Sequence, residues 1–372
     1  MENCRLVSII LFVHTIILSI SSINCSENNS KLVTNQAALF VFGDSLFDPG
    51  NNNYINTTNR ANFFPYGQTF FKFPTGRVSD GRLIPDFIAE KAWLPLIPPN
   101  LQPSNSYNQF TYGVSFASAG AGSLVESFLG QVIDLGTQLK SFKNVKRRLR
   151  SVLGEAEAKR IFAKAVYLFN IGGNDLFYAL FQTSSLVNLN AKEKLVDFII
   201  GNTTSVVEEV YKLGGRKFGF LNVGPYDCSP AASILDTSNI GSCNKRVTEL
   251  INLHNKKFPD GLRLLQRELF GFKYALHDYR TSLLERINNP SKYGFKEGNK
   301  ACCGSGPLRG MPTCGINQTG QSYELCEDVT DYLFFDSAHL TEKAHRQIAD
   351  LIWSAPPNVT GPYNLKALFE LN

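Results

Sequence analysis

The sequence predicts an α/β fold in which helices cover both faces of a parallel β-sheet. Five short apolar runs have the length and composition of buried strands. Each run ends in or near a cluster of Gly, Asn, Asp or Ser, as turns between a strand and a helix do. The runs are residues 37–42, 111–117, 165–171, 217–223 and 272–277. Helical patterns lie between them, and this alternation is typical of a parallel sheet.

The first run, residues 37–42, contains no polar residue and reads as a central strand that is buried on both faces. The sequence Gly-Asp-Ser-Leu follows at residues 43–46. Ligand sites of open α/β sheets lie outside the carboxyl ends of the strands, so Ser45 stands where a nucleophile would be useful. Taken alone, Ser45 is equally explained as the N-cap of a helix.

The helical patterns are clearest in the second half of the chain. Residues 195–213 form one predicted helix, and apolar residues at helical spacing between 247 and 269 predict another, with a kink at Pro259. His254 lies on the apolar stripe of that helix and is interpreted as a core histidine. A terminal helix is expected over residues 341–353, with Thr341 as its N-cap.

Residues 1–25 have the pattern of a secretory signal peptide. Arg5 precedes an apolar stretch at residues 6–20, and small residues follow it. A signal anchor is the alternative, although fifteen residues are short for a membrane span. We therefore expect a protein secreted to the extracellular space or apoplast. Residues 26–372 contain no low-complexity linker and are expected to form one domain.

The cysteines agree with secretion, because six remain after residue 25 and an even number suggests disulfides. They are Cys228, Cys243, Cys302, Cys303, Cys314 and Cys326. A disulfide between Cys228 and Cys243 would close a loop and, in chain-entropy models, stabilise the folded state by about 3 kcal/mol. The other four are expected to staple one long Gly-rich loop. A zinc site is the competing interpretation, but paired Cys-x-x-Cys spacing is absent.

Surface chemistry is predicted at two kinds of position. Asn-x-Ser/Thr sequons, which are candidate N-glycosylation sites, occur at Asn28, Asn56, Asn202, Asn317 and Asn358. The formal net charge is +5, and residues 140–150 form the only strong basic cluster in the sequence. A solvated helix face explains this cluster, and contact with an anionic membrane surface or cell-wall polymer is the alternative. Nucleic acid is not an expected partner of a secreted chain.

A serine nucleophile needs a base within hydrogen-bond reach, and the base needs a carboxylate that fixes its tautomer. Asp336 and His339 are three residues apart, a spacing that places both on one face of a helical turn. One short segment could therefore supply both groups. The alternative is an acidic residue and a histidine that merely flank the start of the terminal helix.

Acyl transfer also needs donors for the oxyanion. Gly120 and Gly122 follow the second strand, and Asn174 follows the third within Gly-Gly-Asn-Asp. Either glycine could bring a backbone N–H close to a ligand, and the Asn174 amide could donate beside it. The phosphate-loop, Gly-x-Ser-x-Gly and His-Glu-x-x-His motifs do not occur in the sequence.

Four ordered blocks make the chain resemble the plant branch of the GDSL esterase/lipase (SGNH hydrolase) family. They are residues 42–46, residues 113–120, residues 172–175 and residues 336–339. Plant-type extensions at residues 48–53, 76–82 and 302–304 match as well, so that the resemblance covers nearly all of residues 37–372. It implies a flavodoxin-like three-layer α/β/α sandwich around a mainly five-stranded parallel sheet.

The resemblance also implies the roles of the site residues. Ser45 would be the nucleophile, His339 the base and Asp336 the residue that orients it. The oxyanion donors would be the backbone N–H groups of Ser45 and Gly120 and the side chain of Asn174. No cofactor and no metal are required by this chemistry.

The implied activity is hydrolysis of carboxylic esters, particularly lipid esters, through an acyl-enzyme. The tail at residues 361–372 resembles that of defence-associated secreted lipases within the family, which implies roles in plant lipid metabolism and pathogen defence. Two alternatives use the same scaffold. One is a myrosinase-associated or epithiospecifier-modifier-like protein that acts in glucosinolate breakdown, and the other is a cell-wall carbohydrate esterase.

Overall fold

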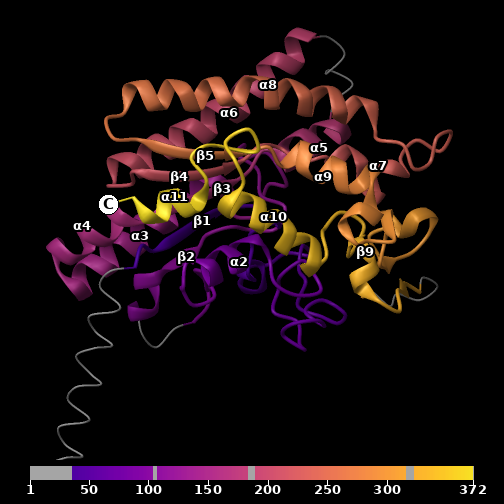
Figure 1. The fold of residues 1–372 in the computed structure, drawn as a ribbon, viewed down its shortest axis with the longest axis horizontal. Helices are drawn as coiled ribbons and strands as arrows, with labels where there is room; N and C mark the ends of the chain where they lie inside the picture. The colour runs from indigo at the N-terminus through magenta and orange to yellow at the C-terminus, as the bar shows by residue number, and fades with distance from the viewer. Residues whose placement is uncertain (1–35, 104–106, 183–188, 316–321, 372) are drawn as a thin grey trace, which may run out of the picture. The chain divides into compact units, whose positions relative to one another are not determined.

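The computed structural model describes residues 36–103, 107–182, 189–315 and 322–371. Residues 38–372 form one compact unit, to which the description below refers (Figure 1). The predicted signal peptide, residues 1–25, lies outside the described residues. Among those described, no helix is both long enough and apolar enough to span a bilayer.

A six-stranded sheet forms the centre of this unit, in the order β10-β5-β4-β3-β1-β2. Its strands are β1 (Leu39–Gly43), β2 (Gly113–Ser115), β3 (Val166–Asn170), β4 (Lys217–Leu221), β5 (Lys273–His277) and β10 (Thr360–Pro362). The strands β1 to β5 are parallel, and all five predicted strands are confirmed. The sixth, β10, was not predicted; it pairs antiparallel with β5 at the edge of the sheet.

Alternate residues of β1 pack into two different cores, which explains its uninterrupted apolar sequence. Leu39 and Val41 belong to one buried cluster, and Phe40 and Phe42 belong to the other. The phenylalanine side continues across the sheet: the rings of Phe42 and Phe169 stack with centroids 4.6 Å apart. Successive side chains of a strand point to opposite faces, so both faces of β1 are covered.

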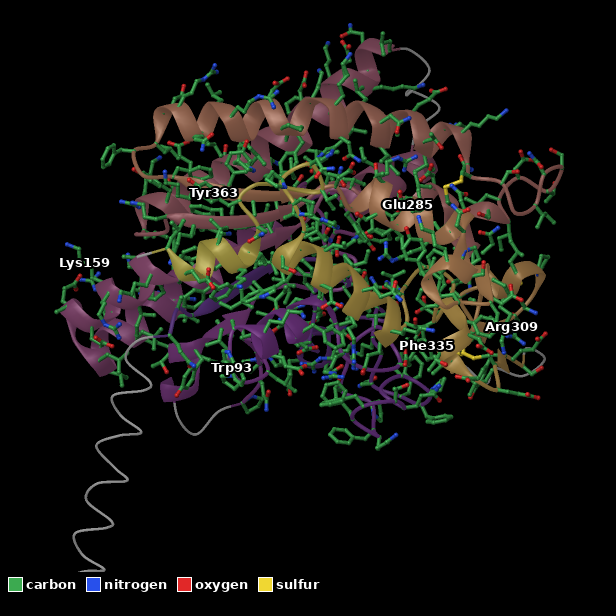
Figure 2. All side chains as sticks on the ribbon, in the orientation of Figure 1. Trp93, Lys159, Glu285, Arg309, Phe335 and Tyr363 are labelled. Atoms are coloured by element: carbon green, nitrogen blue, oxygen red, sulfur yellow. A yellow bond between two sulfur atoms is a disulfide. The ribbon has the colours of Figure 1, made fainter. Side chains whose placement is uncertain are left out.

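Helices cover the two faces and complete three layers, and side chains fill the spaces between them (Figure 2). On the Leu39 face lie α2 (Ile84–Lys91), α9 (Tyr279–Asn288), α10 (Glu342–Ser354) and α11 (Leu365–Glu370). On the Phe40 face lie α3 (Leu135–Leu153), α4 (Glu155–Lys164), α6 (Leu189–Lys212) and α8 (Lys245–Glu268). The α/β/α sandwich implied by the sequence is therefore confirmed.

The predicted helices are present with shifted ends. Most of α6 matches the predicted helix, but α6 already begins at Leu189, and α8 runs through Pro259. His254 is buried on α8 and stacks on Phe258, and burial lowers its pKa to about 4, as expected of a core histidine. The side chain of Thr341 accepts a hydrogen bond from Ala344 N and caps α10 as predicted.

The remaining elements are short and lie in the connections. The helices are α5 (Gly173–Gln182) and α7 (Pro230–Ser233). The 3₁₀ turns are η1 (Asn51–Tyr54), η2 (Tyr107–Tyr112), η3 (Tyr226–Cys228), η4 (Pro290–Tyr293), η5 (Pro307–Arg309) and η6 (Val329–Asp331). The strands are β6 (Glu297–Ala301), β7 (Cys303–Gly304), β8 (Glu324–Leu325) and β9 (Tyr332–Phe334), which form two small two-stranded sheets.

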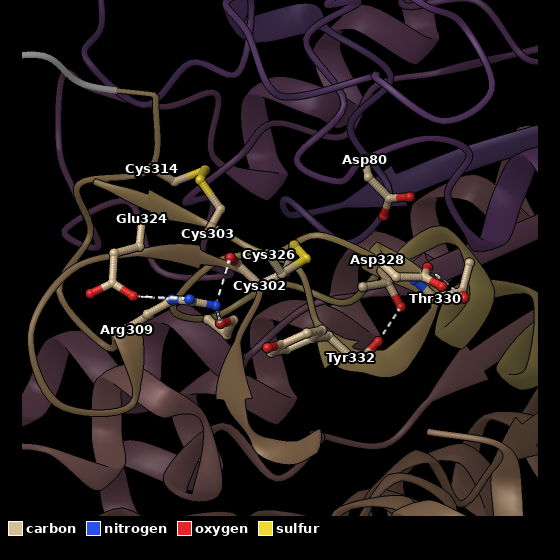
Figure 3. The surroundings of a disulfide bond; sticks show 12 residues. Asp80, Cys302, Cys303, Arg309, Cys314, Glu324, Cys326, Asp328, Thr330 and Tyr332 are labelled. Carbon is tan, nitrogen blue, oxygen red and sulfur yellow. Dashed lines mark hydrogen bonds and ion pairs between the residues drawn. A yellow bond between two sulfur atoms is a disulfide. The ribbon is translucent and has the colours of Figure 1, made fainter. Parts of the chain in front are cut away.

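All six cysteines of the described residues form disulfides, as their even number predicted. The pairs are Cys228–Cys243, Cys302–Cys326 and Cys303–Cys314. The last two lie close together and staple the loop between β6 and β9 (Figure 3), as the clustering of these cysteines predicted. Arg309 also stabilises this loop, because it donates a hydrogen bond to the Cys302 carbonyl and forms a salt bridge with Glu324. The stapled loop ends at β9, directly before the segment that carries Asp336 and His339.

Candidate active site

The three predicted catalytic side chains form one continuous hydrogen-bonded chain. The Oγ atom of Ser45, just beyond β1, lies 2.9 Å from Nε2 of His339. The Nδ1 atom of that ring lies 2.8 Å and 3.0 Å from the two carboxylate oxygens of Asp336. Asp336 is buried, whereas Ser45 and His339 are half-buried and reach the surface. The geometry matches that of a serine nucleophile, a base and an orienting carboxylate.

Asp336 and His339 meet through a turn and not through the helical turn that their spacing suggested. The segment is a bend between β9 and α10. The Asp336 Oδ1 atom accepts hydrogen bonds from the backbone N–H groups of Ala338 and His339, at 2.9 Å and 2.8 Å. An aspartate that binds the backbone two and three residues onward favours such a turn over a helix. The carboxylate therefore holds both the base and the backbone that carries it.

The electrostatics of the pair favour a charged aspartate beside a readily protonated histidine. Burial alone would raise the pKa of Asp336, but the charge of the His339 ring and hydrogen bonds from His339, Ala338 and Tyr66 outweigh it and hold that pKa below its usual range. Burial alone would lower the pKa of His339, but the Asp336 carboxylate outweighs it and raises that pKa above 6.5. A base with such a pKa accepts a proton from a serine hydroxyl near neutral pH.

Tyr66 is the fourth residue of this hydrogen-bonded series, and it was not predicted from the sequence. Its buried hydroxyl donates a hydrogen bond of 2.8 Å to Asp336 Oδ2. Edge-to-face contacts with Phe63 and Phe335 hold its ring. Local sequence patterns do not predict a contact between residues that are 270 positions apart. Tyr66 fixes the carboxylate oxygen that the backbone N–H groups leave free, so it acts as a positioning residue.

Removal of the Tyr66 hydroxyl, in Tyr66→Phe, is expected to lower kcat about tenfold, or about 1.4 kcal/mol, with KM little changed. The ring packing is kept, but Asp336 loses a donor that stabilises its charged form, and its pKa rises. Steady-state kinetics on a soluble ester provides the measurement. Tyr167→Phe is the matched control, because that buried hydroxyl donates to the Phe162 carbonyl within the core. Equal kinetics for both variants would contradict a role for Tyr66 at the site.

The three predicted oxyanion donors are available to a ligand to different degrees. Among the described residues, the backbone N–H groups of Ser45 and Gly120 donate to no protein acceptor. Asn174 lies in the first turn of α5 and donates one amide hydrogen to the Ala121 carbonyl, at 3.0 Å, which ties it to the glycine loop. Its second amide hydrogen stays available to a ligand.

Of the two glycines considered, Gly120 suits a donor better than Gly122. Gly120 is half-buried and has φ of 88°, a conformation that glycine adopts without strain. Gly122 is buried, and a Cβ atom there would lie 2.2 Å from Asp175 Oδ1. The absence of a side chain at Gly122 is therefore explained by packing against Asp175.

Polar side chains of the 48–53 segment hold the loop that carries Gly120. Asp48 Oδ2 accepts a hydrogen bond of 2.9 Å from Ala119 N, and Asn52 donates one of the same length to the Ala119 carbonyl. Ser118 donates to Asn52 Oδ1. Both peptide groups of Ala119 are thus fixed immediately before Gly120. Residues 48–53 match the family by resemblance, but their role was not predicted from the sequence.

The turn that carries Ser45 is held in a comparable way. The buried amide of Gln138, on the first turn of α3, accepts from Gly43 N at 2.9 Å and donates to the Gly43 carbonyl at 2.8 Å. Asp44 accepts from Leu46 N and from the Asn170 side chain, and burial raises the pKa of Asp44 to about 7. These contacts fix the residues on either side of Ser45.

A small pocket with a cavity volume of about 10 Å³ adjoins Ser45 and His339. Its other walls include Tyr226, Tyr279, Leu283, Phe334 and Leu340. A space of this size holds about one water molecule and does not enclose the hydrocarbon chain of an ester.

The predicted glycosylation sites are compatible with modification where the structure describes them. Asn56, Asn202 and Asn358 are exposed. Asn28 and Asn317 lie outside the described residues. Attachment of glycans stays a prediction at all five.

The chain is similar to known proteins over nearly its whole length. The family model described as GDSL-like lipase/acylhydrolase matches residues 39–352. The chain is 72% identical over 371 residues to GDSL esterase/lipase 3 of Arabidopsis thaliana, covering 99% of each chain. It is 49% identical over 337 residues to a GDSL lipase of Tanacetum cinerariifolium, covering 90% of this chain and 88% of that one. It is also 36% identical over 336 residues to inactive GDSL esterase/lipase-like protein 25 of Arabidopsis thaliana, covering 90% and 75%.

Proposed function

We propose that Ser45, His339 and Asp336 are the catalytic triad of this protein. The premise is that the chain belongs to the GDSL-like lipase/acylhydrolase family and is a carboxylic ester hydrolase. The observation that carries this proposal is the unbroken contact from Ser45 Oγ to His339 Nε2 and from His339 Nδ1 to Asp336, at 2.9 Å and 2.8 Å. No further group has to move for the proton of Ser45 to reach its base.

The reaction follows from this arrangement. Ser45 Oγ gives its proton to His339 Nε2 and attacks the ester carbonyl carbon, which forms a tetrahedral oxyanion. The backbone N–H groups of Ser45 and Gly120 and the Asn174 amide donate hydrogen bonds to that oxygen. Collapse breaks the ester C–O bond, and the alcohol leaves with the proton from His339. Water then attacks the acyl-enzyme with His339 again as base, and the acid is released.

The proposed setting is extracellular hydrolysis of lipid esters, in plant lipid metabolism and pathogen defence. The signal-peptide pattern of residues 1–25 and five sequons support secretion. Three disulfides support an oxidising compartment. The names of similar proteins, GDSL esterase/lipase 3 and GDSL lipase, support lipid esters as substrates. The resemblance of residues 361–372 to the tail of defence-associated lipases is what supports the defence role.

Covalent labelling of the wild-type protein tests the triad. A fluorescent fluorophosphonate is expected to add one phosphonyl group per chain, on Ser45, and hydrolysis of p-nitrophenyl esters should fall in proportion. The reagent mimics the tetrahedral intermediate and reacts only with an activated nucleophile. Peptide mass mapping locates the label. A label on another residue, or ester hydrolysis that survives complete labelling of Ser45, would contradict the proposal; a protein that neither labels nor hydrolyses ester would favour the modifier alternative.

A further inference from the structure

The helix α3 carries an unusually one-sided charge. It contains six lysines and arginines and no acidic residue: Lys140, Lys143, Lys146, Arg147, Arg148 and Arg150. Its apolar side is buried in the core through Phe142, Val145 and Leu149. A helix face that is merely solvated usually mixes both signs and gains from pairs of opposite charge. The long helices α6 and α8 do mix them.

The cations of α3 crowd one another at helical spacing. Lys143 and Arg147 are four residues apart, as are Lys146 and Arg150, and like charges at this spacing destabilise a helix. Partial burial and, after it, the nearby Arg150 lower the pKa of Lys146. The arrangement therefore costs stability, and a bound anion would relieve it.

Neighbouring elements neutralise only part of this charge. Glu209 of α6 pairs with Lys143 at 2.9 Å, and Glu155 of α4 pairs with Arg150 at 2.5 Å. Lys146 donates to the Leu213 carbonyl. Within the described part of the chain, Lys140 has no hydrogen-bonding or ionic partner, and the contact found for Arg147 is with the neutral Asn144 side chain.

The surface is hollowed along these side chains. Two adjoining depressions share Asn144 and Arg147, and together they form the basic groove. Its lining comprises Lys140, Lys143, Asn144, Lys146, Arg147, Arg148, Arg150, Ser151 and Leu213. It lies on α3, which packs against α4, the helix that carries the labelled Lys159 in Figure 2.

We propose that the basic groove binds an acidic polysaccharide chain through its carboxylates. Cations at regular intervals along a concave surface complement charges that repeat along a polymer, and Lys and Arg both suit carboxylates. A membrane-surface helix presents an apolar face with aromatic side chains to the bilayer, whereas the apolar face of α3 is buried in the core, and single-stranded nucleic-acid sites place aromatic side chains among their cations. The aromatic residues of α3 and α4, Phe142 and Phe162, are both buried. The choice of an extracellular polymer rests on the proposed secretion, whereas binding itself is independent of the triad.

Binding of polygalacturonate to the full-length secreted protein tests the groove. We expect affinity that falls steeply between about 0.05 and 0.2 M salt, because screening weakens exposed charge contacts. The double variant Lys140→Glu/Arg147→Glu should weaken binding at least about tenfold. The matched control is Arg246→Glu/Lys256→Glu, which makes the same charge change at two exposed positions of α8. Hydrolysis of a soluble ester should be unchanged in both variants, which verifies folding and separates this test from that of the triad.

Three results would overturn the proposal. The first is equal loss of binding in both double variants, which would mean attraction by net charge alone. The second is wild-type binding in the groove variant. The third is binding to vesicles that contain an anionic lipid together with no binding to polygalacturonate, which would make the groove a membrane-contact surface.

Discussion

Replacement of Ser45 by alanine is expected to abolish ester hydrolysis, with kcat lowered by about 10⁴–10⁶. The change removes the atom that attacks the carbonyl, so no acyl-enzyme forms and the oxyanion donors have only uncatalysed attack by water to assist. Stability should change little, because the hydrogen bond described for the Ser45 hydroxyl is the one with His339 at the surface of the site. The kcat for p-nitrophenyl acetate and the thermal midpoint are measured together.

Ser238→Ala is the matched control for this variant. The Ser238 hydroxyl also makes one side-chain hydrogen bond, to Asp236, and it is exposed on another loop. Its kcat should equal that of the wild type. If Ser45→Ala keeps more than about one hundredth of the wild-type kcat, the loss is too small for a nucleophile, and the hydroxyl at Ser45 has another role.

The central fold follows from local patterns in the sequence, whereas its edge does not. Five strands were predictable because residues 37–42 and their counterparts are mainly apolar runs, as is usual for a strand that is covered on both faces. β10 has only three residues, Thr360–Pro362, and includes a glycine and a proline. A segment this short shows no alternation, and proline is tolerated there because the strand lies at the edge of the sheet.

The residues of the candidate site also fall into two groups, those that local sequence patterns predict and those that they do not. The proximity of Ser45, Asp336 and His339 was predictable from residue type and order, with Ser45 directly after a predicted strand and the other two directly before a predicted helix. Tyr66 and Gln138 were not, because each acts through a contact with a residue far away in the sequence, Asp336 and Gly43 respectively. The turn at Asp336 was misjudged for a related reason: spacing shows which residues share a face of a helix but not whether a helix forms. The three side chains that meet were thus predictable from the sequence, and the groups that hold them in place were not.

Asp336→Asn is expected to lower kcat/KM by about 10⁴ while preserving the turn. The asparagine oxygen can keep the hydrogen bonds from Ala338 and His339 that Oδ1 accepts in the wild type. Its NH₂ group then replaces Oδ2, which lies 3.0 Å from His339 Nδ1. Nδ1 lies within reach of both amide atoms, because Oδ1 is 2.8 Å from it. The NH₂ group donates and so populates the tautomer in which Nδ1 accepts and Nε2 carries the ring proton, and in that tautomer Nε2 is unable to take the proton of Ser45.

The pH dependence of the same variant separates charge from geometry. In the wild type, kcat/KM should rise with pH through a pKa above 6.5, because His339 must be neutral to act as base and Asp336 stabilises its protonated form. Without that carboxylate the burial of the ring dominates and favours the neutral form, so the acid limb of the residual activity should move to lower pH.

Asp328→Asn supplies the matched control, since Asp328 accepts a hydrogen bond from Thr330 N, two residues onward, as Asp336 does from Ala338, but is exposed. It should show wild-type rate and profile. An acid limb that stays in place in Asp336→Asn, or moves to higher pH, would mean that Asp336 does not set the pKa of the base. A shifted limb together with the large loss in rate is expected only if one carboxylate both orients His339 and stabilises its charge.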